Sequence, residues 1–373
     1  MGLSLPVAAV ALPPGRPSGP GRVAAVGRTM LWASLALVPA TIVLRFVFQA
    51  GDVTLFAVSA ASLVPLAWLI GEATEHAAEH TGPGVGGFLN ASFGNAPELI
   101  ISLFAVGSGL PNVVRGSIAG SVVSNLLLVL GMALLVSRGD GRVDRTSLWG
   151  GLAIVLCATL LFLAPSVPGW SGDPDRYELA LASVPVASLL LLAYLVQTAR
   201  SLRRHRRLHL AAATEPDTEW TLPFSLVVLA AATAATAVVS EILVHSLEGF
   251  AAKAGISEFF IAAVIVAIVG NAAEHGGAVI IARRGKVGLA AEIAVASGAQ
   301  VALLVAPAVA LLSWAVAPGL ALSFRPVELA TMAAAALLGM AVFWDRRGVS
   351  REGALLLLAY ALAVALYWAA GDR

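Results

Sequence analysis

Long apolar segments separated by short polar ones run through most of this chain. From Leu31 onward, stretches of about 20 apolar residues recur, and each is long enough to cross the roughly 30 Å hydrocarbon layer of a membrane as a helix. Of the 373 residues, 59% are hydrophobic and only 12% are charged, so lipid is the solvent for most of the chain. We therefore predict an all-α polytopic membrane protein. The net charge of +1 gives no broad basic surface, so no nucleic-acid partner is expected.

The apolar pattern predicts about eleven transmembrane helices. A Pro- and Gly-rich segment, 1–29, precedes them and is expected to be a disordered tail, and the charged segment 200–221 is expected to be a solvated linker. Most Lys and Arg residues fall on the side that holds the N-terminus and this linker, so both are predicted to be cytoplasmic, in a plasma (inner) membrane protein. The predicted spans are 30–48, 53–72, 84–107, 113–137, 146–165, 178–199, 222–245, 256–282, 288–317, 326–343 and 351–370.

The chain also contains an internal repeat. The motif GNAPE, which ends at Glu98, recurs as GNAAE, which ends at Glu274, and the same spacing of 176 residues aligns Glu72 with Glu248 and Ser121 with Ser297. Each copy holds five spans, and an odd number of spans forces the two copies into opposite orientations. The prediction is two inverted five-helix repeats, 53–199 and 222–370, after an extra N-terminal helix at 30–48.

Each repeat places one carboxylate inside an apolar span. A charged side chain at that depth costs at least ~2.5 kcal/mol, so Glu98 and Glu274 require compensation. Gly94 and Pro97 are expected to break the first helix just before Glu98, which frees backbone oxygens near the carboxylate. The second copy has Ala273 in place of the proline, so a milder break is expected there.

The following span of each repeat carries hydroxyl and amide side chains. Spacings of three and four place Ser117, Ser121, Ser124 and Asn125 on one helical face, and Ser297 and Gln300 stand in the second copy. Oxygen ligands of this kind suit a small hard cation such as calcium. The predicted metal site consists of Glu98, Glu274, Asn95, Asn271, Ser121, Asn125, Ser297 and Gln300.

Protons are expected to compete with the cation for the two glutamates. Two carboxylates held close together in a poorly hydrated site are not both ionised when the site is empty, so at least one binds a proton. Competition within a site that opens alternately to each side is sufficient for antiport. Ion entry or proton relay is a further prediction for Glu72, Glu75, Glu79, Glu248 and His275. The alternatives are a solvated helix end for the glutamates and a hydrogen-bonded core group for the histidine.

These residues resemble the calcium/proton exchanger (CAX) family of the cation/calcium antiporter superfamily. The resemblance is carried by GEATEHAAEH, GGFLNASFGNAPELIISL, GSIAGSVVSNLLLVLG, SEILVHSLEG, ISEFFIAAVIVAIVGNAAEHGGAV and ASGAQVALLVAP. It implies that Glu98 and Glu274 carry the metal ion and the protons in turn, and it also admits manganese as cargo. Family members often have an acidic stretch between the halves, whereas the stretch here is mostly basic.

The sequence also admits other classes of protein. A sodium-driven exchanger has the same architecture, although Val301 stands at the repeat position of Asn125 and removes a polar ligand, which favours protons. A channel is a further alternative, but a channel has less need for two broken helices in opposite orientations. His76, Glu79 and His80 match the H-x-x-E-H pattern of a zinc metallopeptidase, but this motif is short and lacks an evident further ligand. It lies in the segment GEATEHAAEH, which is predicted to be an acidic cytoplasmic loop between the second and third spans. We expect no enzyme activity and no cofactor, with Ca²⁺ and H⁺ as substrates and the oligomeric state undetermined.

Overall fold

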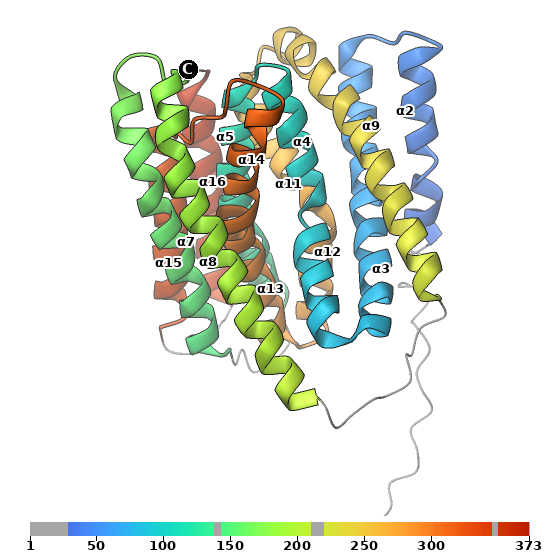
Figure 1. Ribbon diagram of the computed structural model, residues 1–373, viewed down its shortest axis with the longest axis vertical. Helices are drawn as coiled ribbons and strands as arrows, with labels where there is room; N and C mark the ends of the chain where they lie inside the picture. Colours follow the sequence, from blue (N-terminus) through green and yellow to red (C-terminus); the bar gives the residue numbers. More distant parts are fainter. Residues whose placement is uncertain (1–28, 138–142, 210–219, 345–349, 373) are drawn as a thin grey trace, which may run out of the picture.

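The computed structural model describes residues 29–137, 143–209, 220–344 and 350–372, and nearly all of them are helical (Figure 1). The predicted disordered tail, apart from its last residue, and residues 210–219 of the predicted linker lie outside the described residues. The first half contains α2 (Leu37–Phe46), α3 (Asp52–Phe93), α4 (Ala96–Gly107), α5 (Pro111–Val123), the π-helical turn η1 (Ser124–Val129), α6 (Leu130–Val136), α7 (Arg145–Ser166), η2 (Val167–Trp170) and α8 (Tyr177–His209).

The second half is also helical, with more interruptions than the first. It contains α9 (Leu222–Ala254), α10 (Glu258–Phe260), the π-helical turn η3 (Ile261–Val266), α11 (Ala267–Gly270), α12 (Ala272–Arg283), α13 (Val287–Gln300), the π-helical turn η4 (Val301–Val305), α14 (Ala306–Leu312), η5 (Ser313–Ala315), α15 (Pro326–Val342) and α16 (Ser350–Ala370).

The helices confirm the polytopic all-α fold. Within the described ranges, eight helices are long and apolar enough to cross a membrane, and a ninth span is formed if the bent pair Glu258–Gly270 and Ala272–Arg283 is counted as one. Two shorter apolar helices, α4 and α15, stand at the third and tenth predicted spans. Every predicted span therefore has a helical counterpart.

The acidic segment GEATEHAAEH is helical, which corrects the prediction of a loop between the second and third spans. Residues 71–80 all belong to α3. The chain nevertheless reverses soon afterwards. This is evident because a Cβ added to Gly86 would lie 2.5 Å from the Cβ of Ala78. Eight residues of a straight helix would separate these positions by about 12 Å. The reversal returns the chain toward the membrane interior and leads into α4.

α8 also differs from the prediction, because it continues to His209, ten residues into the segment 200–221 that was expected to be a linker. Its apolar span ends at Arg200. The extension SLRRHRRLH contains mainly Arg and Leu, which are good helix formers, so the helix continues past its apolar span.

The two halves have opposite orientations. In Figure 1, α4, which follows the first helix break, lies in the upper part of the molecule, whereas α12, which follows the second break, lies in the lower part. The bend between α11 and α12 is 58°. Equivalent half-helices thus point in opposite directions, as the odd number of spans per repeat requires.

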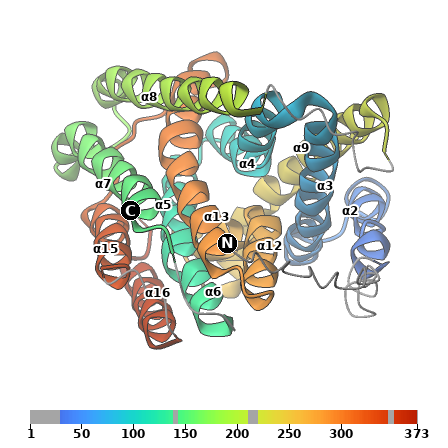
Figure 2. The same cartoon turned by 90° about the horizontal axis from the view of Figure 1, so that it is seen from below.

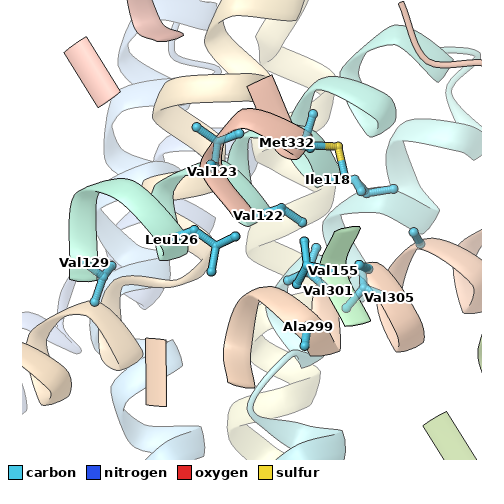
Figure 3. Packing of buried hydrophobic residues seen from close by; sticks show 14 of the residues in the cluster. Ile118, Val122, Val123, Leu126, Val129, Val155, Ala299, Val301, Val305 and Met332 are labelled. Carbon is cyan, nitrogen blue, oxygen red and sulfur yellow. The ribbon is translucent and has the colours of Figure 1, made fainter. Parts of the chain in front are cut away.

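The next span of each half, Pro111–Val136 and Val287–Ala315, lies at the centre of the bundle. The spans differ in the share of their most apolar 18 residues that is buried inside the protein. This share is 83% in Pro111–Val136 and 72% in Val287–Ala315, but only 6% in the N-terminal helix Thr29–Phe46. Seen from below, α5 and α13 are surrounded by other helices and α2 lies at the periphery (Figure 2). Valines from both halves, among them Val122 and Val301, pack together in this core (Figure 3).

Small residues allow the central helices to approach closely. A Cβ added to Gly120 of α5 would lie 1.9 Å from the carbonyl oxygen of Ala263 in η3, so only glycine fits there. The upper end of α5 is fixed by Arg115, which is 1% exposed and donates to Asp175 Oδ1 at 2.6 Å and to the Ala321 carbonyl at 3.1 Å. These contacts hold α5 in place against the second half.

Candidate cation site

Both GNxxE motifs break a helix at the asparagine. Asn95 separates α3 from α4 with φ −97° and ψ 12°, and Asn271 separates α11 from α12 with φ −93° and ψ 11°. This region of backbone space is sparsely populated and is common in functional sites. The carbonyl of Asn95 accepts from the N–H of Leu99, and that of Asn271 accepts from the N–H of His275, so each asparagine begins the next helix.

The second break does not differ from the first in the conformation of its asparagine, although a milder break was expected there. Pro97 lies in the first turn of α4. A backbone N–H at that position has no partner within the helix, so the missing N–H of proline changes little. Ala273 therefore permits the same break.

The polar residues of the companion helices lie next to π-helical turns. Ser121 lies in α5 and Asn125 in η1, whereas Ser297 and Gln300 lie in α13 directly before η4. The two turns occur at the same place in the repeat to within one residue. A π-helical turn inserts one extra residue into a helix, and such turns are frequent at functional sites. The sequence analysis did not predict these turns, because their residues are as apolar as the rest of the helix.

Hydrogen bonds join each asparagine to the companion helix of the opposite half. Asn271 Nδ2 donates to Ser121 Oγ at 3.0 Å and to the Ala267 carbonyl at 2.8 Å, and Asn125 Nδ2 donates to Asn271 Oδ1 at 3.2 Å. In the other direction, Asn95 Nδ2 donates to Gln300 Oε1 at 2.7 Å. Both groups of hydrogen bonds therefore join residues of the two repeats, and together they are called the polar cluster below.

The two glutamates belong to this cluster. Glu98 is 4% exposed, and a Cβ added to Gly270 would lie 3.3 Å from its Oε1, so the carboxyl group rests against the second helix break. Glu274 is half-buried and accepts a hydrogen bond from Ser297 Oγ. Gly270, against which the Glu98 carboxyl group rests, precedes Glu274 by four residues in the same break. All eight residues of the predicted site thus come from the two breaks and their companion helices.

Some oxygen atoms of the cluster have no partner in the protein. Glu98 Oε2 and Asn125 Oδ1 are buried and make no hydrogen bond within the described residues. Buried polar atoms are nearly always satisfied, so these two are suited to contact water or a cation. Val301, at the repeat position of Asn125, packs among apolar residues such as Val155 instead (Figure 3). The two halves of the cluster are therefore not equivalent.

The residues proposed for ion entry or relay lie outside the hydrogen-bonded cluster. Glu72 is half-buried, while Glu75, Glu79 and Glu248 are exposed. His275 follows Glu274 and is buried, and its Nε2 has no hydrogen-bond partner in the part of the chain that the structure describes. Ion entry or proton relay at these positions stays a prediction.

The histidines of the H-x-x-E-H motif make contacts that do not suit a zinc site. The ring of His76 stacks on Trp220 with centroids 4.5 Å apart, and His80 Nε2 lies 2.6 Å from the Trp220 carbonyl oxygen. Among the residues that the structure describes, no group of three or more His, Cys, Asp or Glu side chains is arranged to hold a metal ion. The hypothesis of a zinc metallopeptidase therefore gains no support from the structure.

Two inverted repeats, each with a broken helix that contributes to one central polar cluster, define a secondary transporter. The sequence profile described as "Sodium/calcium exchanger protein" matches residues 52–203 and again 224–369. Among curated relatives, the Ca(2+)/H(+) antiporter ChaA of Bacillus subtilis is 39% identical over 83% of this chain and 90% of its own length. A Ca(2+)/H(+) antiporter of Aphanothece halophytica is 34% identical over 83% of this chain and 88% of its own. The chain belongs to the sodium/calcium exchanger protein family, which contains transporters rather than enzymes.

Solved structures agree with this assignment. The structure of native YfkE, 33% identical, covers 91% of this chain and 99% of its own with a TM-score of 0.77. An H⁺/Ca²⁺ exchanger structure named CAX has a TM-score of 0.71 over 92% of both chains, and at 17% identity it supports the fold alone. The predicted resemblance and the predicted fold are both confirmed.

Proposed function

We propose that this multi-pass membrane protein exchanges calcium for protons, with Glu98 and Glu274 as the groups that bind both. The observation that carries the proposal is that the carboxyl group of Glu98, from the first repeat, rests against the helix break that carries Glu274, where amide and hydroxyl groups of both repeats gather. Relatives that are more than 30% identical over most of the chain are described as Ca²⁺/H⁺ antiporters.

The chemistry of the cluster fits this exchange. Carboxylate, amide and hydroxyl oxygens are the ligands that calcium prefers, and its usual six to eight ligands can be drawn from both halves together with water. When calcium leaves, two neighbouring carboxylates in a poorly hydrated pocket do not both stay ionised, so protons take its place. Cation and protons then occupy the same site in alternation.

The two inverted halves provide the transport step. Asn271 is held by Ser121 and Asn125 of the first half, and Asn95 by Gln300 of the second. A displacement of one half against the other changes which end of the site reaches water while the cluster stays between them. A gradient of protons thereby drives calcium in the opposite direction.

Transport measurements in proteoliposomes test the assignment. Under an imposed pH gradient, we expect calcium flux from the wild-type protein and none from Glu98→Gln or Glu274→Gln, because glutamine cannot exchange a proton for a cation. Glu178→Gln, an exposed glutamate of α8, is the matched control and should retain flux. Wild-type flux from either site variant would refute the assignment.

Two further arms identify the coupled ion and the cargo. The same vesicles are given a sodium gradient without a pH gradient, and manganese replaces calcium in a parallel series. Calcium movement driven by sodium alone would show a sodium-coupled exchanger instead, and movement of manganese but not calcium would reassign the cargo.

We also infer that the protein lies in a cell membrane, with its N-terminus and the linker between α8 and α9 on the cytoplasmic side. This orientation follows from the excess of Lys and Arg on that side. Lys286 and Lys253 are exposed at opposite ends of the bundle. In a Cys157→Ala background, a membrane-impermeant thiol reagent added to intact cells should label Lys253→Cys and not Lys286→Cys, and the reverse result would invert the topology.

A further inference from the structure

Ser102 carries a hydroxyl group that the proposed exchange does not use. It lies in α4 and is 1% exposed, and its Oγ has no hydrogen-bond partner within the described residues. Glu98 precedes it by four residues in the same regular helix. Residues four apart lie on one helical face, so this hydroxyl stands one turn beyond the carboxylate of the candidate site.

Most buried hydroxyl groups in these helices behave differently. They donate to the carbonyl oxygen one turn earlier, as Thr74, Thr159, Ser166, Ser183, Thr236 and Ser246 do. Ser102 has the same opportunity at the carbonyl of Glu98 and makes no such bond. A buried hydroxyl without a partner costs free energy, so a group outside the protein is expected to satisfy it.

Another buried oxygen atom without a hydrogen-bond partner in the described residues lies on the same face of α4. Glu98 Oε2 is also buried without a hydrogen-bond partner in the described part of the chain, and helical side chains lean toward the N-terminus of their helix. The Cα–Cβ bond of Ser102 is therefore tilted toward the turn that carries Glu98. Asn125 Oδ1 is a third buried oxygen without a partner in the cluster. At the repeat position of Ser102 the second half has Ala278, which is buried and offers no oxygen.

We propose that Ser102 supplies a further oxygen ligand to the cation bound at Glu98 and thereby sets the preference for calcium. This inference rests on the proposed function of the same site. Calcium takes six to eight oxygen ligands, whereas manganese is suited to octahedral sites with six. An additional hydroxyl oxygen in the first half alone therefore favours the ion with the higher coordination number.

Substitutions at Ser102 test the inference by cation selectivity. For Ser102→Ala in proteoliposomes at a fixed pH gradient, we expect the KM for calcium to rise by roughly two- to ten-fold, the range that corresponds to one lost polar contact. The KM for manganese should change by less than that. Ser102→Thr keeps the hydroxyl group and should restore the calcium preference, which a purely structural role for the serine would not predict.

Two further variants keep the test decisive. Ser240, in α9, carries another buried hydroxyl group that has no hydrogen-bond partner in the described residues. Ser240→Ala removes this group and should leave the ratio of the KM values for calcium and manganese unchanged. Ser102→Cys nearly preserves the side-chain volume, so it tests the oxygen even if Ser102→Ala folds poorly, and it should lower the calcium preference because sulfur is a poor calcium ligand.

A wild-type selectivity ratio in Ser102→Ala or Ser102→Cys would overturn the proposal. An equal change in Ser240→Ala would do the same, because the effect would then be a general one of lost hydroxyl groups. These outcomes are distinct from a failure of the proposed function, which would appear as flux in Glu98→Gln.

Discussion

The two halves pack closely at Gly120, next to the candidate site, and an alanine there should disrupt both stability and transport. A Cβ at this position would lie 1.9 Å from the Ala263 carbonyl oxygen and 2.6 Å from its carbonyl carbon, whereas ordinary contact begins at 3.4 Å. The obstacle is backbone, which cannot rotate away. For Gly120→Ala, α5 and η3 must therefore separate by about 1.5 Å, the difference between 3.4 and 1.9 Å.

The polar cluster has little tolerance for such a separation. Ser121, the next residue, accepts from Asn271 at 3.0 Å, and Asn125 donates to Asn271 at 3.2 Å. A shift of ~1.5 Å takes both distances beyond the range of a hydrogen bond. Overpacking costs about 1–3 kcal/mol and each lost bond about 1 kcal/mol, so we expect a total of ~3–5 kcal/mol.

Thermal unfolding in detergent and calcium flux in proteoliposomes measure the two consequences. Gly150→Ala in α7 is the matched control, because a Cβ there meets nothing within 4 Å. Alanine is the better helix former by about 0.5–1 kcal/mol, so this variant should unfold at or above the wild-type temperature and keep full flux. If Gly120→Ala were as stable and as active as Gly150→Ala, the reasoning from close helix contact would be wrong.

Three other predictions follow from the structure. Asp175→Asn should lower the free energy of unfolding by about 2–3 kcal/mol and Arg115→Met by only ~1–2 kcal/mol, because the guanidinium is 1% exposed and the carboxylate, at 34%, still reaches water. Equal losses in denaturation experiments would contradict this. The KM for calcium should rise as the pH on the loading side falls, because a protonated carboxyl group cannot bind the cation; a KM independent of pH would exclude competition. Trp220→Ala should destabilise the protein by ~1–3 kcal/mol, since it removes the ring on which His76 stacks, and an unchanged melting temperature would show that this contact contributes nothing.

The sequence alone was sufficient for features that depend on local chemistry. The length of each apolar segment predicts a span regardless of its neighbours. Gly94 and Pro97 predict a break because each disfavours a continuous helix, and the repeated motif that begins at Gly270 predicts the second one. The inverted orientation follows from an odd number of spans between equivalent residues. These inferences led to the correct fold and family.

Local chemistry was insufficient where neighbouring elements decide the outcome. The acidic segment before Thr81 was expected to be a loop, but Glu and Ala are strong helix formers, and the reversal needs only a few residues. Likewise, the expected difference between the two breaks depended on Pro97, whose position in the first turn of a helix makes its missing N–H unimportant.

The arrangement of the site was decided only by the tertiary structure. The sequence identified the eight polar residues but not their partners, and Asn95 and Asn271 each bond to the half that does not contain them. The π-helical turns also have no sequence signal, because they depend on how α5 and α13 pack in the centre of the bundle. Residue types determine what a membrane-embedded side chain needs, whereas the packing of the two halves determines which residue meets that need.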